Sequence, residues 1–559
     1  MEPLLRIDTG DRCPALFYAP DTRVRYPYPM QEPASTAPDG KTATRDRVPF
    51  SQKFGYGLGS FQDMWGHWLY PALVYLVFNI YLGVAPKWIA RALLFKLLFE
   101  AVWDSVFGWW SDNARTRFGR RRPFLLVGGV LAGCILPLLF QARPGWTDLQ
   151  YFGFMVSTLA LLVPIMSCFY MPFQSLGAEL TPDYHERTSI GAMRSAVQKF
   201  PELAMFAAGA FCTAGVWVSA SWSEAPARLA KLFMQTVGWF GNIAASLFTL
   251  DFARFGVLMK TIFGWAPAVE GAKPNILIGA QVFTTVLGCI LVVTGILLFA
   301  LTRERYYTKL VAGRQAKISI KDTLWKALSC KPFRANLSMA LAYGIGTSMI
   351  STLGYYCTIY YVCRGNVAVG NSWNFWMGLA SMLLGFCGIP VYTKLSRALG
   401  KKKAMVLVQI CAIAVSLSSW WLYTPAIDWL QVLYSGFTAF TGAGFWILYG
   451  SMTADVIDYD ELQTTKRREG AFSACGSWIL KLGVGIGSWA SGEILSQTGF
   501  DATLGGNQTP HAIFTMRLLF AVIPVVGSVM ALIFLIRFPL TPSRMEEIRV
   551  QLEARRGQV

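Results

Sequence analysis

The sequence predicts an all-α polytopic membrane protein of about twelve transmembrane helices, and three observations support this fold class. Of its 559 residues, 54% are hydrophobic and only 15% are charged, whereas a soluble protein carries roughly a quarter charged residues. Long apolar runs recur from about Gly57 to Arg537, and about 20 apolar residues are enough to cross the hydrocarbon of a bilayer. Basic residues concentrate in the loops after every second run, which is the positive-inside pattern.

The lengths of the apolar runs predict twelve helices in two sets of six. The first set is expected at residues 56–82, 88–110, 124–141, 151–180, 190–220 and 275–302. The second set is expected at residues 335–362, 372–395, 404–424, 428–455, 470–495 and 512–537. A basic linker separates the sets, so the sequence predicts a 6+6 arrangement.

The polar segments complete the predicted organisation. Residues 1–53 are polar and proline-rich without an apolar core, which indicates a disordered cytoplasmic tail rather than a signal peptide. An N-terminal six-helix bundle is expected at 54–302, a cytoplasmic linker at 303–334, and a C-terminal six-helix bundle at 335–540. Residues 541–559 are expected to form a second cytoplasmic tail.

An insertion at about 222–272, between the fifth and sixth helices, is too long for a simple loop. Within it, segment 228–264 mixes apolar residues with charged ones such as Lys231 and Asp251. We interpret the segment as one or two amphipathic helices at the periplasmic surface of the membrane. An extra pair of spanning helices would preserve the downstream orientation equally well.

An internal repeat supports the division into halves. "RTRFGRRRPFLL", after the second helix, resembles "SRALGKKKAMVL", after the eighth. Both place a glycine and three cations before an apolar run, where glycine permits a tight turn and the cations anchor the cytoplasmic face. Two parallel halves with this layout are typical of facilitator-type transporters.

Composition argues against several other classes of protein. The net charge of +18 is spread over alternate loops rather than over one surface with base-stacking partners, so we expect no nucleic-acid partner. The eleven cysteines are scattered, without a CxxC pair or a histidine at metal spacing. We expect no cofactor, no metal beyond a sodium ion, and a monomer in the lipid bilayer.

Three ionisable residues lie inside the second predicted helix. Four-residue steps place Lys96, Glu100 and Asp104 on one face. A charge at a helix centre costs about 2.5–3.5 kcal/mol on insertion scales, so this face should point to the bundle interior or to a water-filled cavity. The pattern fits either a cation site for sodium or a proton, or a structural ion pair between Lys96 and Glu100.

Other helices also carry polar residues within apolar surroundings. Lys481 lies too deep to snorkel easily, whereas Arg194 lies one to two turns inside the fifth helix and could do so. Asp63 stands among aromatic residues in "GLGSFQDMWGHW", and a carboxylate with aromatic neighbours is typical of sugar sites. Taken alone, a tryptophan is more often an interfacial anchor, and His67 more often a hydrogen-bonded core residue than a proton relay.

Four motifs carry a family resemblance: "YGLGSF", "WDSVFGWWSDNARTRFGRRRPF", "MPFQSLGAELTPDYHERTSIGAMR" and "MTADVIDYDELQTTKRREGAFSACGSWILK". They span the chain from Phe54 to about Leu495 and resemble the glycoside–pentoside–hexuronide:cation symporters, the melibiose permease branch of the major facilitator superfamily. The resemblance implies symport of a sugar, glycoside or uronide with Na⁺ or H⁺ by alternating access. It also implies an inner-membrane location with both termini in the cytoplasm, and no enzymatic activity.

The resemblance implies a cation-coupling site at Glu100 and Asp104, with Lys96 beside it. Tyr170 stands where melibiose permease has an acid, so the coupling ion stays open between Na⁺ and H⁺. The missing acid also shifts the cavity towards positive charge, which favours an acidic sugar such as a uronide. The implied substrate-binding residues are Asp63, Tyr170, Gln174, Arg194, Trp478 and Lys481.

Charged residues at the cytoplasmic helix ends are expected to form a conformational gate. Contacts between the halves open and close there during alternating access, although simple anchoring of the topology would also explain the arginines. The expected gate residues are Asp112, Arg117, Arg120, Arg121, Arg122, Arg187, Asp455 and Asp458.

Two alternative functions remain at this point. A lysolipid-type carrier of the same superfamily would need a lateral opening lined by apolar residues. A membrane-embedded transferase would need paired catalytic acids or a nucleophile–base pair. The acids of "DVIDYDEL" lie beside the basic "KRRE", where charge pairing explains them.

Overall fold

The computed structural model describes residues 47–114, 116–180, 184–249, 251, 262–265, 273–304, 328–464, 469–501 and 504–556. The chain divides into two units between Arg47 and Val48, and all the helices described below belong to the second unit. Most of the expected N-terminal tail, and the linker from residue 305 to 327, lie outside the described residues.

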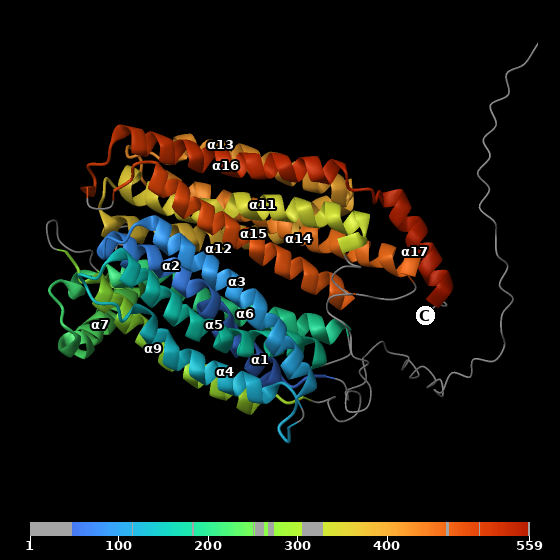
Figure 1. Ribbon diagram of the computed structural model, residues 1–559, viewed down its shortest axis with the longest axis horizontal. Coiled ribbons are helices and arrows are strands. Elements are labelled where there is room, and N and C mark those ends of the chain that lie inside the picture. The colour runs from blue at the N-terminus through green and yellow to red at the C-terminus, as the bar shows by residue number, and fades with distance from the viewer. Residues whose placement is uncertain are drawn as a thin grey trace, which may run out of the picture. The chain divides into compact units, whose positions relative to one another are not determined.

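Six long helical stretches form the first group in Figure 1. The first joins α1 (Phe50–Met64), the π-helical η1 (Trp65–Leu69), α2 (Tyr70–Val74) and the π-helical η2 (Tyr75–Tyr81). The others are α3 (Pro86–Asn113), α4 (Arg122–Ile135) with η3 (Leu136–Phe140), α5 (Asp148–Glu179), α6 (Tyr184–Cys212) and α9 (Ile276–Leu301).

Six more stretches form the second group, coloured yellow to red in Figure 1. They are α11 (Lys331–Tyr356) with η8 (Cys357–Val362), α12 (Val367–Leu399), α13 (Lys401–Leu422), α14 (Leu430–Thr464), α15 (Glu469–Gln497) and α16 (Pro510–Ile536). In the described part of the chain, the expected all-α fold is therefore confirmed, and these two sets of six helical stretches agree with the expected 6+6 arrangement.

Polar residues just outside the apolar runs begin several of these helices. The Asn275 side chain accepts the backbone N–H of Ile278 at the start of α9, and Thr509 caps α16 in the same way. At α5, Thr147 and Gln150 form a reciprocal capping box. Such caps satisfy backbone N–H groups that have no partner within the helix.

Apolar composition marks only half of the helices as membrane spans. Six of the described helical stretches are long and apolar enough to cross a bilayer, namely α4 with η3, α5, α9, α12, α13 and α16. Helices α3 and α15, by contrast, carry the charged residues that the sequence places in the bundle interior. The two groups meet where α3 packs against α15 and where α6 packs against α12.

Two helices end at residues other than the expected ones. α14 extends to Thr464 rather than 455, and α6 ends at Cys212 rather than 220. The expected C-terminal tail contains a helix, α17 (Pro542–Arg556). Its buried Met545, Ile548 and Leu552 join the core of the second group, because their spacing places them on one helical face.

The two repeated glycine turns have matching backbone conformations. Gly119 precedes α4 with φ of 111°, and Gly400 precedes α13 with φ of 79°. Residues with a Cβ atom rarely adopt positive φ, so glycine is suited to both turns. The repeat seen in the sequence is thus a repeat of local structure.

Candidate functional site

The expected acid pair on α3 faces the lysine of α15. The Lys481 ammonium donates to Glu100 Oε1 at 2.9 Å and to Asp104 Oδ2 at 2.6 Å. The four-residue spacing of the acids aligns both carboxylates on one face of α3, which packs against α15. Lys481, expected at the substrate, therefore lies within the expected cation-coupling site.

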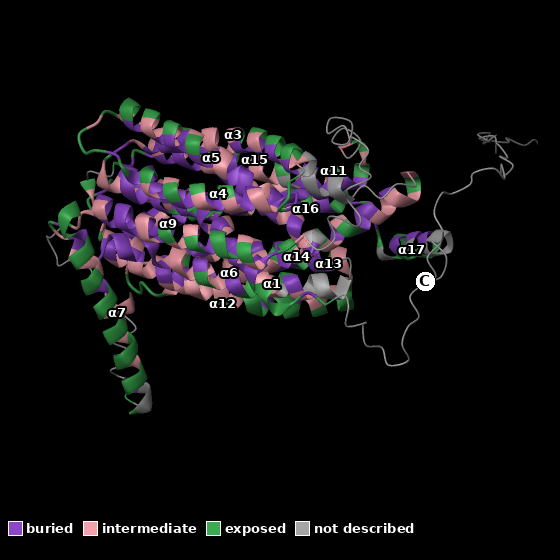
Figure 2. Ribbon diagram, turned by 90° about the horizontal axis from the view of Figure 1, so that it is seen from below, coloured by how far each residue is buried: buried purple, intermediate pink, exposed green. Residues whose placement is uncertain are grey.

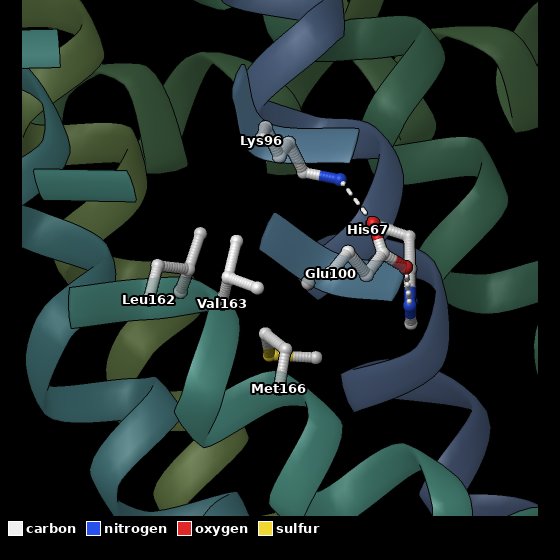
Figure 3. Close-up of a pocket in the computed structure, with 7 residues that line it drawn as sticks. His67, Lys96, Glu100, Leu162, Val163 and Met166 are labelled. Atoms are coloured by element: carbon white, nitrogen blue, oxygen red, sulfur yellow. Dashed lines mark hydrogen bonds and ion pairs between the residues drawn. The ribbon is translucent and has the colours of Figure 1, made fainter. Parts of the chain in front are cut away.

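Glu100 has two further partners from the first group of helices. Lys96 donates to Glu100 Oε2 at 3.1 Å, and the Nε2 atom of His67 lies 3.2 Å from Oε1. Figure 3 shows both side chains directed at the Glu100 carboxylate, opposite an apolar wall of Leu162, Val163 and Met166 from α5. These groups line a small pocket.

A second charged cluster joins α1, α5 and α6. Arg194 Nη2 donates to Asp63 Oδ2 at 2.7 Å, and Arg194 Nη1 donates to Gln174 Oε1 at 3.1 Å. The guanidinium also lies over the ring of Phe173, 4.9 Å from its centroid. Three of the expected substrate-binding residues, Asp63, Gln174 and Arg194, are thus in direct contact.

His67 and Tyr170 connect the two clusters. The Nδ1 atom of His67 lies 3.0 Å from the backbone oxygen of Asp63 and 3.7 Å from its carboxylate. The rings of His67 and Tyr170 are 4.6 Å apart, and the Lys481 ammonium lies 4.8 Å from the centre of the Tyr170 ring. We call this whole set the central network: Asp63, His67, Lys96, Glu100, Asp104, Tyr170, Gln174, Arg194 and Lys481.

Charges within the central network balance. Three carboxylates, of Asp63, Glu100 and Asp104, meet three cations, and each cation lies within 3.1 Å of a carboxylate. The expected shift of the cavity towards positive charge is therefore compensated among these residues. Oδ1 of Asp104 is buried without a hydrogen-bond partner among the described groups, which leaves an acceptor for an incoming ligand.

The sequence did not place His67 in the site, although a signal was present. Residues four apart lie on one face of a helix, so Asp63 and His67 share a face, and the ring lies between the Asp63 and Glu100 carboxylates. Trp478 was expected to bind substrate, but its side chain is 43% exposed and the described contacts do not join it to the central network.

The turn at residues 117–122, which leads into α4 and which we call the arginine turn, binds an acid from the same group of helices. The backbone N–H groups of Arg120, Arg121 and Arg122 donate to the Glu304 carboxylate at 2.8, 2.7 and 3.0 Å. Anions are favoured at a helix N-terminus, where N–H groups are unpaired and the helix dipole is positive. Glu304, which follows α9, was not recognised from the sequence.

The remaining expected gate residues occupy varied surroundings. Asp455 pairs with Lys401 of the second glycine turn, with 2.7 Å between the ammonium and each carboxylate oxygen. Asp458 is half-buried on α14, and Arg117 lies over the ring of Phe118. The side chains of Asp112 and Arg187 lie outside the described part of the structure.

Contacts between the two groups of helices also occur at the other end of α3 and α15. Tyr356 Oη donates to Asn79 Oδ1 at 2.6 Å in a buried hydrogen bond. The Lys87 backbone N–H donates to Ser496 at 3.1 Å. This end lies opposite the arginine turn along α3. The sequence did not predict these two hydrogen bonds between the groups of helices.

Comparison with known proteins agrees with this architecture. An uncharacterized symporter of Synechocystis is 24% identical over 92% of this chain and 98% of its own length. The isoprimeverose transporter of Lactiplantibacillus pentosus is 23% identical, covering 90% of this chain and 91% of that protein.

The crystal structure of a D-xylose–proton symporter has the same fold, with a TM-score of 0.53 and 13% identity over 86% of this chain and 97% of the other. Residues 55–542 match the family described as MFS/sugar transport proteins, where MFS is the major facilitator superfamily. Its members are transporters rather than enzymes and cross the membrane several times. This chain therefore belongs to the MFS/sugar transport protein family.

Proposed function

We propose that the protein is a secondary active transporter that moves a sugar or glycoside together with H⁺ or Na⁺ by alternating access. The observation that supports this most strongly is the central network, which links a substrate-side cluster to an acid pair through His67 and Tyr170. The network also crosses between the two groups of helices through Lys481.

The geometry suggests how ion and sugar binding are coupled. A cation that binds Glu100 or Asp104 competes with the Lys481 ammonium for the same oxygens. Because Lys481 belongs to α15 and the acids to α3, weakening that contact loosens the two groups of helices. Ion binding thereby favours the rocking motion that carries a substrate across the membrane.

The substrate side of the network is equipped for hydroxyl groups. Asp63 and Gln174 offer acceptors and Arg194 offers donors, and these residues already contact one another. Because the three cations are paired with carboxylates, we propose a neutral sugar or glycoside rather than a uronide.

We further propose that both termini lie in the cytoplasm, since the arginine turn and the linker carry the basic residues that the positive-inside rule places there.

Uptake by the purified protein in liposomes tests the proposal. Radiolabelled neutral glycosides, pentosides and a uronide are compared under an imposed proton gradient, a sodium gradient, and no gradient. We expect accumulation of a neutral sugar only with one of the gradients. Transport of lysolipids without any sugar would instead support the carrier alternative, and uronide uptake alone would contradict the neutral substrate.

A further inference from the structure

The insertion between α6 and α9 forms a helix that stands apart from the bundle. This helix, α7 (Ala225–Phe248), leaves the bundle sideways at the end opposite α17, as Figure 2 shows. The preceding α6 ends at Cys212 and the following α9 begins at Ile276. Both flanking helices thus attach α7 at one end of the bundle, where spanning helices emerge from the bilayer.

Three faces run along α7. One packs against the rest of the insertion, where Leu232 is buried, Thr236 accepts a hydrogen bond from Trp265 Nε1 at 2.9 Å, and Trp239 meets Phe263 ring to edge. A second face is polar and includes Lys231 and Asn242, both exposed. The third is apolar, and we call it the exposed apolar face: Ala230, Phe233, Met234, Val237, Phe240, Gly241 and Ala244.

Steps of three and four residues connect the members of the exposed apolar face, so they form one stripe along the helix. Phe233 is 67% exposed, Met234 66% and Phe240 54%. Leu161 of α5, on the outer surface of a membrane-spanning helix, is 57% exposed. The large side chains of the stripe are therefore as exposed as a side chain on the outer surface of a membrane-spanning helix.

We propose that α7 lies in the membrane interface, with its exposed apolar face in the lipid and its polar face towards water. A helix with separate apolar and polar faces binds a bilayer surface in this orientation. Continuity with the bundle favours lipid as the occupant, because α7 contacts α9, a spanning helix that the same bilayer encloses. Trp222, 51% exposed just before α7, adds the kind of aromatic side chain that is enriched at this depth.

The packed face fixes which side of α7 meets the lipid. The hydrogen bond from Trp265 and the ring contact with Phe263 keep α7 from rotating about its own axis. A hydrogen bond from the Asn275 backbone to the Trp217 oxygen, at 3.0 Å, ties the base of the insertion to the start of α9. The insertion is therefore attached so that the stripe keeps a defined orientation.

A fluorescent amino acid introduced by stop-codon suppression tests this orientation in the full-length protein in liposomes. It is placed on the apolar face, at position 237 or 240, or on the polar face, at position 231 or 242. Each variant is titrated with lipids that carry a nitroxide on the upper acyl chain, and separately with iodide in water. Variants without a single monodisperse peak are replaced by position 234 on the apolar face, or by position 238, which is exposed and four residues before Asn242 on the polar face.

We expect lipid nitroxide to quench positions 237 and 240 at least threefold more strongly than positions 231 and 242, and iodide to show the reverse order. Equal quenching of all four positions by iodide would mean that α7 stands in water, and would overturn the proposal. Protection of positions 237 and 240 from both quenchers would overturn it as well, in favour of a protein partner or a second copy. Neither measurement depends on sugar uptake, so this test is independent of the proposed function.

Discussion

Glu100 is held by Lys96, Lys481 and His67 at once, with 2.9–3.2 Å between the paired atoms. A buried carboxylate is costly without such partners, and each partner comes from a different place in the chain: α3 itself, α15 and the π-helical η1. Asp104, one turn further along α3, shares only Lys481 with it among the described ion pairs. The two acids therefore differ in how easily each can exchange a partner.

Neutralising either acid should separate substrate binding from ion coupling. Glu100→Gln and Asp104→Asn are each expected to abolish gradient-driven accumulation while leaving substantial sugar binding, because a neutral amide cannot balance a coupling cation. Accumulation in liposomes and equilibrium binding by calorimetry measure the two quantities. Ser105→Ala, beside Asp104 on α3, is the matched control and should retain both. Normal accumulation in both acid variants would contradict the coupling role.

Lys96→Ala distinguishes tuning of the ion site from a purely structural pair. An isolated buried pair would lose about 3–5 kcal/mol when broken. Here Glu100 keeps Lys481 and His67, so we expect a loss of only about 1–3 kcal/mol, in the range of one charged hydrogen bond. We also expect stronger dependence of uptake on sodium, because one of the two ammonium groups that compete with the ion for Glu100 is gone.

Thermal unfolding and sodium-dependent uptake measure the two effects of Lys96→Ala. Lys96→Arg keeps the positive charge and should resemble the original protein in its sodium dependence. A large loss of stability with unchanged sodium dependence would instead identify Lys96 as a structural partner only.

At the level of secondary-structure elements, the arginine turn binds Glu304 through three backbone N–H groups. Three successive N–H groups at the start of α4 converge on one carboxylate, which joins the end of α9 to the α3–α4 turn. The positive φ of Gly119 shapes this turn, and a Cβ atom there would lie 2.7 Å from Glu304 Oε1. A larger residue at 119 would therefore disturb both the turn and its bound carboxylate.

Glu304→Gln should destabilise the protein by about 1–2 kcal/mol, because the amide offers a weaker acceptor to the positive end of the helix dipole. Unfolding temperature in detergent measures this change. Glu547→Gln is the control: Glu547 pairs with Arg544 on the exposed face of α17, and such surface pairs contribute little. An unchanged unfolding temperature in the Glu304 variant would show that the charge of Glu304 does not contribute measurably to stability.

Arg121→Ala should slow uptake while leaving equilibrium sugar binding within a few-fold. The substitution keeps the backbone N–H that Glu304 accepts, so only contacts of the side chain are lost. Initial uptake rates and binding in detergent provide the comparison. A large loss of binding in a folded variant would place Arg121 in substrate recognition, and reduced membrane insertion would favour a role in topology.

At the scale of the whole molecule, contacts between the two groups of helices extend from Asp104 and Lys481 to the far ends of α3 and α15. Alternating access requires such contacts to break when the substrate leaves on that side. The buried hydrogen bond between Tyr356 and Asn79 is one contact that a single substitution removes cleanly.

Tyr356→Phe should shift the protein towards the state that is open at this end, by about 0.5–1.5 kcal/mol, the usual net contribution of a hydrogen bond. Distances between spin labels at the Pro86 end of α3 and the Gln497 end of α15 report the populations. Tyr355→Phe is a close control, because Tyr355 bonds to Asn371 within its own group of helices. Equal shifts in both variants would contradict a specific closing role for Tyr356.

The all-α fold, the twelve helices of the two groups and the acid pair of α3 could be predicted from the sequence. These features depend on local information: run length, four-residue spacing and the cost of charge in a bilayer. Helix α17 carried an equally local signal in the spacing of Met545, Ile548 and Leu552, but its polar composition resembled that of a tail.

Which charged residues are neighbours depends on how the helices pack, and the sequence did not reveal this. Lys481 is 377 residues from Asp104 in the chain, yet it pairs with that carboxylate, and Glu304 reaches the arginine turn across 182 to 184 residues. Helical spacing indicates which residues share a face, but not which face of another helix packs against it. Because α3 packs against α15, Lys481, which we expected at the sugar, pairs with the acids of α3 instead. Its charge is thereby paired with carboxylates, although the sequence suggested a cavity with excess positive charge.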